Sequence, residues 1–183
     1  MKKYHKPMMA TAYIWANQSS CTRKQVGAIL SKKGRIISNG YNGTVVGADN
    51  CCEDEVFDKV KVCPNCGHGN FWDTDAFGLE DGKHCKSCDD KYDGKNLKIK
   101  LVPRLVSKGS VVHAEANALT FAAKHGLKTK GCSMYITLSP CIECAKLMKQ
   151  AGIKKVFYAE SYREDEGVQF LLANGVKVKK YDV

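Results

Sequence analysis

The sequence predicts an α/β fold in which one mixed β-sheet carries helices on both faces. Two short apolar runs, residues 26–30 and 35–38, flank the turn Lys32-Lys33-Gly34 and predict a β-hairpin. From residue 113 onward, stretches with helical spacing alternate with short apolar runs, a pattern typical of β-α units around a sheet. With 183 residues, 44% of them hydrophobic, the chain is long enough to bury a core.

Each element follows from the local pattern. Residues 4–18 predict the first helix, because their apolar side chains recur at helical spacing. The polar, glycine-rich residues 39–43 predict a loop after the hairpin. The remaining expected elements are a helix at 113–125, a strand at 133–137, a helix capped by Ser139 and opened by Pro140 that ends at Gly152, a strand at 155–159, a helix at 166–174 and a strand at 176–178.

An acidic, cysteine-rich segment, residues 53–104, interrupts this order and shows almost no amphipathic period. We therefore expect one domain, residues 1–183, that carries this segment as an insertion. Its two C-x-x-C pairs, Cys63/Cys66 and Cys85/Cys88, are separated by eighteen residues. That spacing is typical of a zinc ribbon, so these four thiols are the expected ligands of a structural zinc ion.

The remaining cysteines and the charge are less specific. Ten cysteines, with no secretory signal or long apolar run, predict metal or redox chemistry in a cytosolic protein rather than disulfides. Four cysteines lie outside the C-x-x-C pairs, and burial as free thiols is the default expectation for them: Cys21, Cys51, Cys52 and Cys132. For Cys51 and Cys52, metal binding and a role at an interface stay open as alternatives. The net charge of +10 attracts phosphate in any form, from a nucleotide to a nucleic acid, and does not choose between them.

Two short motifs predict the chemistry. His113 and Glu115 open one expected helix, and Cys141 and Cys144 lie three residues apart at the start of another. One imidazole and two thiolates suit a zinc ion that keeps a fourth position open for water. The first turn of a helix favours thiolates, and Glu115 is placed to carry protons as a catalytic acid and base. This H-x-E and P-C-x-x-C combination is typical of zinc-dependent nucleobase deaminases, and a purely structural zinc module would not need Glu115.

In these motifs the chain resembles deoxycytidylate (dCMP) deaminases of the bacterial and phage type. These belong to the zinc-dependent cytidine and deoxycytidylate deaminase superfamily. The resemblance rests on residues 21–28, 40–43, 113–115, 137–144 and 151–156. It implies a cytidine-deaminase-like mixed sheet and hydrolysis of dCMP to dUMP and ammonia, which supplies dUMP for dTMP synthesis.

The resemblance also implies a substrate site. By matching position, Arg23 would contact the 5′-phosphate, Asn42 would hold the sugar, and Tyr162 with Arg163 would close over the nucleotide. The base would contact Ala114, Leu138 and Ser139.

Further expectations concern partners. The resemblance implies a homo-oligomer, with a hexamer favoured, dCTP and dTTP as effectors, and Mg²⁺ accompanying a nucleotide effector. The expected location is the cytoplasm (the host cytoplasm if the chain is phage-encoded), with no membrane partner. The resemblance also implies that related enzymes usually carry a shorter segment than this insertion, in the neighbourhood on which their regulation depends.

Other activities stay open as alternatives. One is a cytosine or adenine deaminase that edits tRNA or single-stranded DNA, and another is a deaminase of dCTP or a modified dCMP. No stretch of the sequence interleaves aromatic and basic residues as a nucleic-acid stacking platform does, and a single arginine suits a mononucleotide.

Overall fold

The computed structural model describes residues 4–69, 71–73, 83–88, 91–92, 97–162 and 164–181. The chain divides into two compact units: a larger one of Met1–Glu53 and Ser107–Val183, and a smaller one of Asp54–Val106. The smaller unit begins one residue later and ends two residues later than the insertion expected at 53–104. None of the described helices is both long enough and apolar enough to cross a bilayer.

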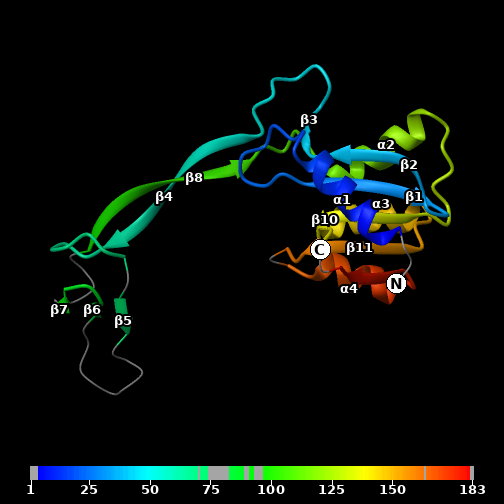
Figure 1. The fold of residues 1–183 in the computed structure, drawn as a ribbon. Helices are drawn as coiled ribbons and strands as arrows, with labels where there is room; N and C mark the ends of the chain where they lie inside the picture. The colour runs from blue at the N-terminus through cyan, green and yellow to red at the C-terminus, as the bar shows by residue number, and fades with distance from the viewer. Residues whose placement is uncertain are drawn as a thin grey trace. The chain divides into compact units, whose positions relative to one another are not determined.

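The larger unit is built on a five-stranded sheet with the order β12-β11-β10-β1-β2 (Figure 1). β1 pairs antiparallel with both β2 and β10, while β10, β11 and β12 run parallel. The sheet is therefore mixed, as predicted. Its strands are β1 (Gly27–Lys32), β2 (Arg35–Tyr41), β10 (Ser133–Leu138), β11 (Lys155–Glu160) and β12 (Lys177–Lys180).

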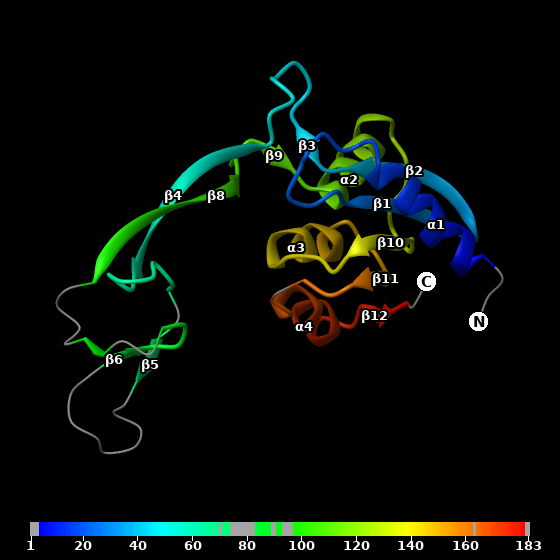
Figure 2. The same cartoon turned by 60° about the vertical axis from the view of Figure 1, so that its left-hand side comes forward.

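Helices cover both faces of this sheet, which confirms the predicted layers (Figure 2). On one face, α1 (His5–Ala16) packs Met9 and Ala12 against Ile29 and Tyr135. On the other face, the core joins apolar side chains of the sheet to those of three helices, α2 (Ala114–Lys124), α3 (Ile142–Gln150) and α4 (Glu166–Ala173).

The close packing of α2 on β2 depends on Gly40. A Cβ atom at this position would collide with the carbonyl oxygen of Ala114 and the amide nitrogen of Ala118. Two side-chain hydrogen bonds fix the same contact: the Ser38 hydroxyl donates to the Ala118 carbonyl at 2.7 Å, and the Asn117 amide donates to the Tyr41 carbonyl at 3.0 Å. These contacts set the position of the first turn of α2.

Two local predictions were wrong in the larger unit. Residues 39–41 belong to β2 rather than to a loop, because they continue the pairing with β1 from Ile29 to Gly27. α3 begins at Ile142, with Cys141 as its N-cap, so Ser139 does not cap the helix and Pro140 does not open it. The Ser139 hydroxyl instead accepts a hydrogen bond from the Tyr162 N–H at 2.7 Å, and the Ser139 N–H donates to the Glu160 carbonyl.

The smaller unit contains regular structure that the sequence pattern did not reveal. β4 (Glu53–Val62) and β8 (Lys98–Ser107) form a two-stranded sheet. The short strands β5 (Phe71–Asp73), β6 (Lys83–Cys85) and β7 (Lys91–Tyr92) form another. In the larger unit, β3 (Gly43–Thr44) pairs with β9 (Val111–Val112) just before α2.

Gly40→Ala should lower the free energy of unfolding by about 1–3 kcal/mol, because the added methyl group forces α2 away from β2. Gly43→Ala is the matched control, since nothing lies within 4 Å of a Cβ added there. That variant should stay within about 0.5 kcal/mol of the parent protein. Urea denaturation of both variants measures the difference, and equal stabilities would contradict this account of the α2–β2 contact.

Candidate active site

Two helix starts bring the three predicted catalytic zinc ligands together. His113 is the N-cap of α2, Cys141 is the N-cap of α3, and Cys144 lies one turn into α3. The His113 Nδ1 atom lies 3.4 Å from each of the two Sγ atoms, and all three donor atoms lie within 4.8 Å of one another. One imidazole and two thiols at this spacing fit a single zinc ion.

The electrostatics of this cluster also favour a cation. Hydrogen bonds from Cys144 and His113 lower the pKa of Cys141 to about 3. The neighbouring Cys141 sulfur and burial raise the pKa of Cys144, and the hydrogen bond to Cys141 raises the pKa of His113. The three groups thus share protons around one sulfur anion, at the point where a metal ion would replace those protons.

Glu115 lies beside the cluster in the first turn of α2. Its residue is only 4% exposed, and this burial raises the pKa of its carboxyl to about 7. The cost of burying the charged form is the physical cause, and it outweighs the attraction of His113. A carboxyl group balanced near neutral pH can both accept and return a proton, which is what a general acid–base requires.

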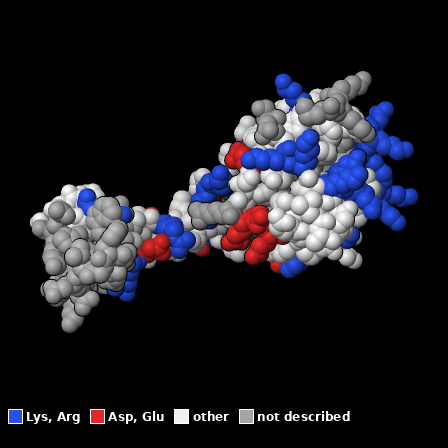
Figure 3. Space-filling view, turned by 90° about the horizontal axis from the view of Figure 1, so that it is seen from below, with Lys and Arg blue, Asp and Glu red and all other residues white. Residues whose placement is uncertain are grey.

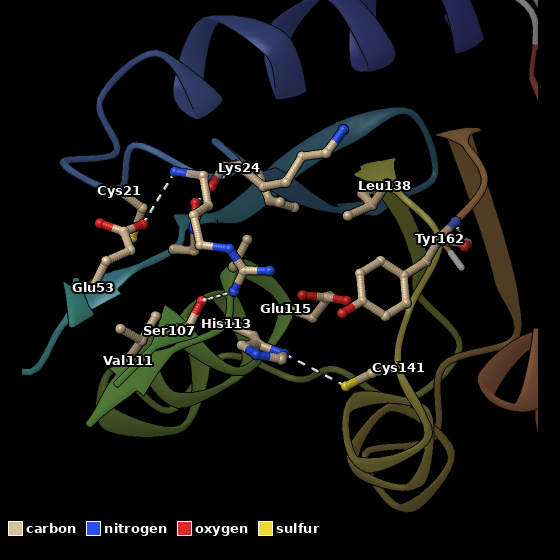
Figure 4. A pocket seen from close by; sticks show the side chains of 15 residues that line it. Cys21, Lys24, Glu53, Ser107, Val111, His113, Glu115, Leu138, Cys141 and Tyr162 are labelled. Carbon is tan, nitrogen blue, oxygen red and sulfur yellow. Dashed lines mark hydrogen bonds between the residues drawn. The ribbon is translucent and has the colours of Figure 1, made fainter. Parts of the chain in front are cut away.

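A pocket in the larger unit opens onto these groups (Figure 4). Its wall includes His113, Glu115 and Cys141. All six residues predicted to bind substrate also line it: Arg23, Asn42, Ala114, Leu138, Ser139 and Tyr162. Arg163, expected to act with Tyr162, lies outside the described residues.

Arg23 is held at the pocket by two residues that the sequence did not single out. The Arg23 Nη1 atom donates to the Ser107 hydroxyl at 3.1 Å. The Glu53 carboxylate accepts hydrogen bonds from the backbone N–H groups of Thr22 and Arg23, at 3.0 and 3.1 Å. Glu53 and Ser107 lie at the two junctions with the smaller unit, and no motif marks them, so only the folded chain reveals their role.

Asn42 is buried, and both ends of its amide are already bonded. Its Oδ1 atom accepts from the Val26 N–H at 2.7 Å, and its Nδ2 atom donates to the Lys24 carbonyl at 2.8 Å. The side chain therefore joins the end of β2 to the loop that carries Arg23. Sugar binding by Asn42 stays a prediction.

Tyr162 stands at the other side of the pocket. Its backbone is tied to Ser139, while 43% of the residue is exposed and its ring projects into the pocket (Figure 4). This position leaves the ring free to lie against a bound molecule instead of packing in the core.

The smaller unit contains a second cluster of possible metal ligands. Its four sulfur atoms all lie within 4.8 Å of one another and come from Cys63, Cys66, Cys85 and Cys88. The Gly67 N–H donates to the Cys63 carbonyl, which makes the tight turn expected after the first pair. The N–H groups of Ser87 and Cys88 point at the Cys85 sulfur and lower the pKa of that thiol to about 6. Four thiols with a stabilised thiolate fit a tetrahedral zinc ion.

The expectation of four buried free thiols outside the pairs was partly wrong. Cys21 and Cys52 form a disulfide, and Cys51 is exposed, whereas Cys132 is buried and free. The bond links the loop before β1 to the residue preceding β4, so it ties together two segments near the pocket. No sequence motif predicts this bond, because the two cysteines are 31 residues apart and meet only in the folded chain.

Comparisons with known proteins agree with this geometry. The family model described as the cytidine and deoxycytidylate deaminase zinc-binding region matches residues 2–160. The chain belongs to this zinc-binding deaminase family. It is 37% identical to the deoxycytidylate deaminase of Enterobacteria phage T4, over 93% of this chain and 86% of that protein.

Solved structures of deaminases share the fold. A dCMP deaminase from the cyanophage S-TIM5, crystallised with dCMP and dUMP, matches with a TM-score of 0.68 and 31% identity, covering 99% of this chain and 98% of that one. A structure from a study of tRNA:A34 deaminases matches with a TM-score of 0.51 and 16% identity, covering 96% of this chain and 92% of that one. The second match shows the fold alone.

Asn42→Ala should lower the free energy of unfolding by about 1–3 kcal/mol, because it leaves the Val26 N–H and the Lys24 carbonyl without their partner. Asn39→Ala is a matched control three residues away on β2, where no side-chain hydrogen bond is described, and it should change stability by less than about 0.5 kcal/mol. Urea denaturation measures both. If Asn42→Ala were as stable as the parent, the bridging role of this amide would be wrong.

Proposed function

We propose that this deaminase hydrolyses dCMP to dUMP and ammonia. The observation that carries the proposal is the buried Glu115 carboxyl beside the His113, Cys141 and Cys144 donor set, at the wall of a pocket that also holds Arg23. The relatives named deoxycytidylate deaminase, and the related structure with dCMP and dUMP, support this choice of substrate.

His113, Cys141 and Cys144 would hold the catalytic zinc ion, with Glu115 free for proton transfer. When bound, zinc supplies Lewis acidity that brings the pKa of a water molecule to about 7. Glu115 carries one proton from the attacking water to N3 of the cytosine ring. As the bond between C4 and the amino nitrogen breaks, Glu115 moves a second proton from the added hydroxyl to the amino group. Ammonia leaves, and the ring keeps a C4 carbonyl and an N3–H.

The other pocket residues would bind and orient the nucleotide. Arg23 presents a planar guanidinium suited to the 5′-phosphate, held in place through Glu53 and Ser107. Asn42 would contact the sugar, and Tyr162 would close over the nucleotide. The segment at the end of β10 would meet the base through Leu138 and Ser139, with Ala114 opposite on α2.

We infer that the chain is one deaminase domain with an inserted zinc ribbon. A structural zinc ion at the four cysteines of the smaller unit would bring the content to about two zinc ions per chain. The cluster geometry and the turn at Gly67 support this assignment.

Regulation, assembly and location rest on family resemblance alone. We propose dCTP and dTTP as effectors, with Mg²⁺ accompanying the nucleotide, a homo-oligomer with a hexamer favoured, and a cytoplasmic location. A triphosphate substrate, dCTP, stays open as an alternative within the same chemistry.

The charge distribution does not favour polynucleotide editing. The register of the sheet places Lys155 and Lys177, the first residues of β11 and β12, at the same end of the sheet as Lys32 and Arg35 of the β1–β2 hairpin. The pocket lies at the opposite ends of β10 and β2, near Leu138 and Asn42. Figure 3 shows Lys and Arg side chains gathered on one side of the larger unit. These basic residues therefore lie at the end of the sheet opposite the pocket, where an edited base would have to react.

Glu115→Gln should retain zinc but lower kcat for dCMP by about 10²–10⁴-fold or more, because the amide cannot carry protons. Glu143→Gln is the control, since Glu143 is an exposed acid on α3 paired with Lys146 and lies outside the pocket wall. Ammonia release and zinc content are measured for the parent and both variants. Turnover by Glu115→Gln within tenfold of the parent would refute the proton-carrier role. Faster ammonia release from a cytosine-containing oligonucleotide than from dCMP would replace the proposed function with the editing alternative.

A further inference from the structure

The two long strands of the smaller unit present two different faces. β4 and β8 run side by side, and the Arg104 guanidinium of β8 donates to the Asp58 carboxylate of β4 at 2.6 Å (Figures 1 and 2). This ion pair puts Asp58 and Arg104 on one face. Because side chains alternate along a strand, the odd-numbered residues of both strands share the opposite face.

The odd-numbered face carries several apolar side chains that are open to solvent. Phe57 is 56% exposed, Ile99 65%, Leu101 55% and Leu105 42%. A two-stranded sheet is marginally stable alone in water, and a contiguous exposed apolar patch marks an interaction surface. We call this surface the ribbon face, made of Glu55, Phe57, Lys59, Lys61, Ile99, Leu101, Pro103 and Leu105.

Two opposite charges of the ribbon face flank Phe57 symmetrically. Glu55 precedes it by two residues and Lys59 follows it by two, so both share its face with opposite charges. Both side chains are exposed, and within the described part of the chain neither has an ion-pair partner. If two such rows are laid antiparallel, Phe57 lies opposite Phe57 and each Glu55 lies opposite a Lys59, so the charges attract.

We propose that the ribbon face packs against the ribbon face of a second copy of this chain. A two-fold axis beside Phe57, perpendicular to the strands, lays β4 of one copy antiparallel over β4 of the other. Phe57 then meets its counterpart, Glu55 of each copy faces Lys59 of the other, and the apolar row of β8 covers the same row of the second copy. Such an isologous contact satisfies both charges twice.

The charges select this arrangement over the other face-to-face symmetry. A two-fold axis parallel to the strands would lay β4 over β8 of the second copy. Glu55 and Lys59 would then lie against the row of Ile99, Leu101 and Leu105, which offers no charge. Of these two arrangements, only the antiparallel one pairs Glu55 with Lys59 and covers the apolar side chains of β8 with one another.

Charge reversal tests the proposal on the full-length protein. Glu55→Lys and Lys59→Glu should each weaken self-association at this face about tenfold or more, since each creates like-charge contacts. The double variant in one chain, and an equimolar mixture of the two single variants, should both restore it. Sedimentation velocity over a concentration series measures the dissociation constants, and circular dichroism with zinc content verifies folding. No weakening in either single variant would overturn the proposal. So would weakening without rescue in the mixture, which is the result expected if the deaminase unit of the same chain covers this face.

Residue-specific cross-linking gives a second, independent test. Phe57→Cys should yield a covalent dimer on mild oxidation, joined through residue 57 of both chains, because this position faces its own counterpart. Val102→Cys is the control, since Val102 is exposed on the opposite, Arg104-bearing face. Peptide mapping distinguishes the new link from bonds through the native cysteines. Equal dimer yields from both positions, or no link at residue 57, would overturn the proposed contact.

Discussion

The candidate active site depends on the contact between α2 and the end of the sheet. Because Gly40 has no side chain, α2 approaches β2 closely. The hydrogen bonds of Ser38 and Asn117 then fix the position of α2 along β2. This contact places His113 at the point where α3 presents Cys141 and Cys144. Two helix starts that are distant in sequence are thereby held so that three donor atoms share one position.

The same contact explains the character of Glu115. One turn of α2 both presents His113 to the sulfur atoms and buries Glu115 behind it, and burial is what raises the pKa of that carboxyl. The Arg23 guanidinium also lines this pocket, and hydrogen bonds to Glu53 and Ser107 hold Arg23 in place. The proposed proton carrier, Glu115, and the proposed phosphate ligand, Arg23, thus line the same pocket from different elements, as the proposed nucleotide substrate requires.

The sequence predicted what is encoded locally. The mixed sheet, the helices on both faces and both sets of metal ligands follow from periodicity and cysteine spacing, and the structure brings each predicted set together. Features that depend on tertiary contacts were missed. α3 starts at Ile142 because Ser139 bonds to Tyr162 instead of capping the helix. β4 and β8 were overlooked because charged and apolar residues are mixed along both strands. The Cys21–Cys52 bond and the Glu53 contacts were missed because they join segments about 30 residues apart.

The central claim is a zinc ion held by one nitrogen and two sulfur ligands from the starts of α2 and α3. X-ray absorption at the zinc edge tests it most directly, on the parent protein and on the Cys63→Ser/Cys85→Ser variant, in which only the catalytic ligand set stays complete. The account predicts about one zinc ion per chain in the variant, with about two sulfur ligands and the rest nitrogen or oxygen, against an average of about three sulfurs over the two sites of the parent. A variant that binds no zinc, or whose remaining zinc has four sulfur ligands, would contradict it.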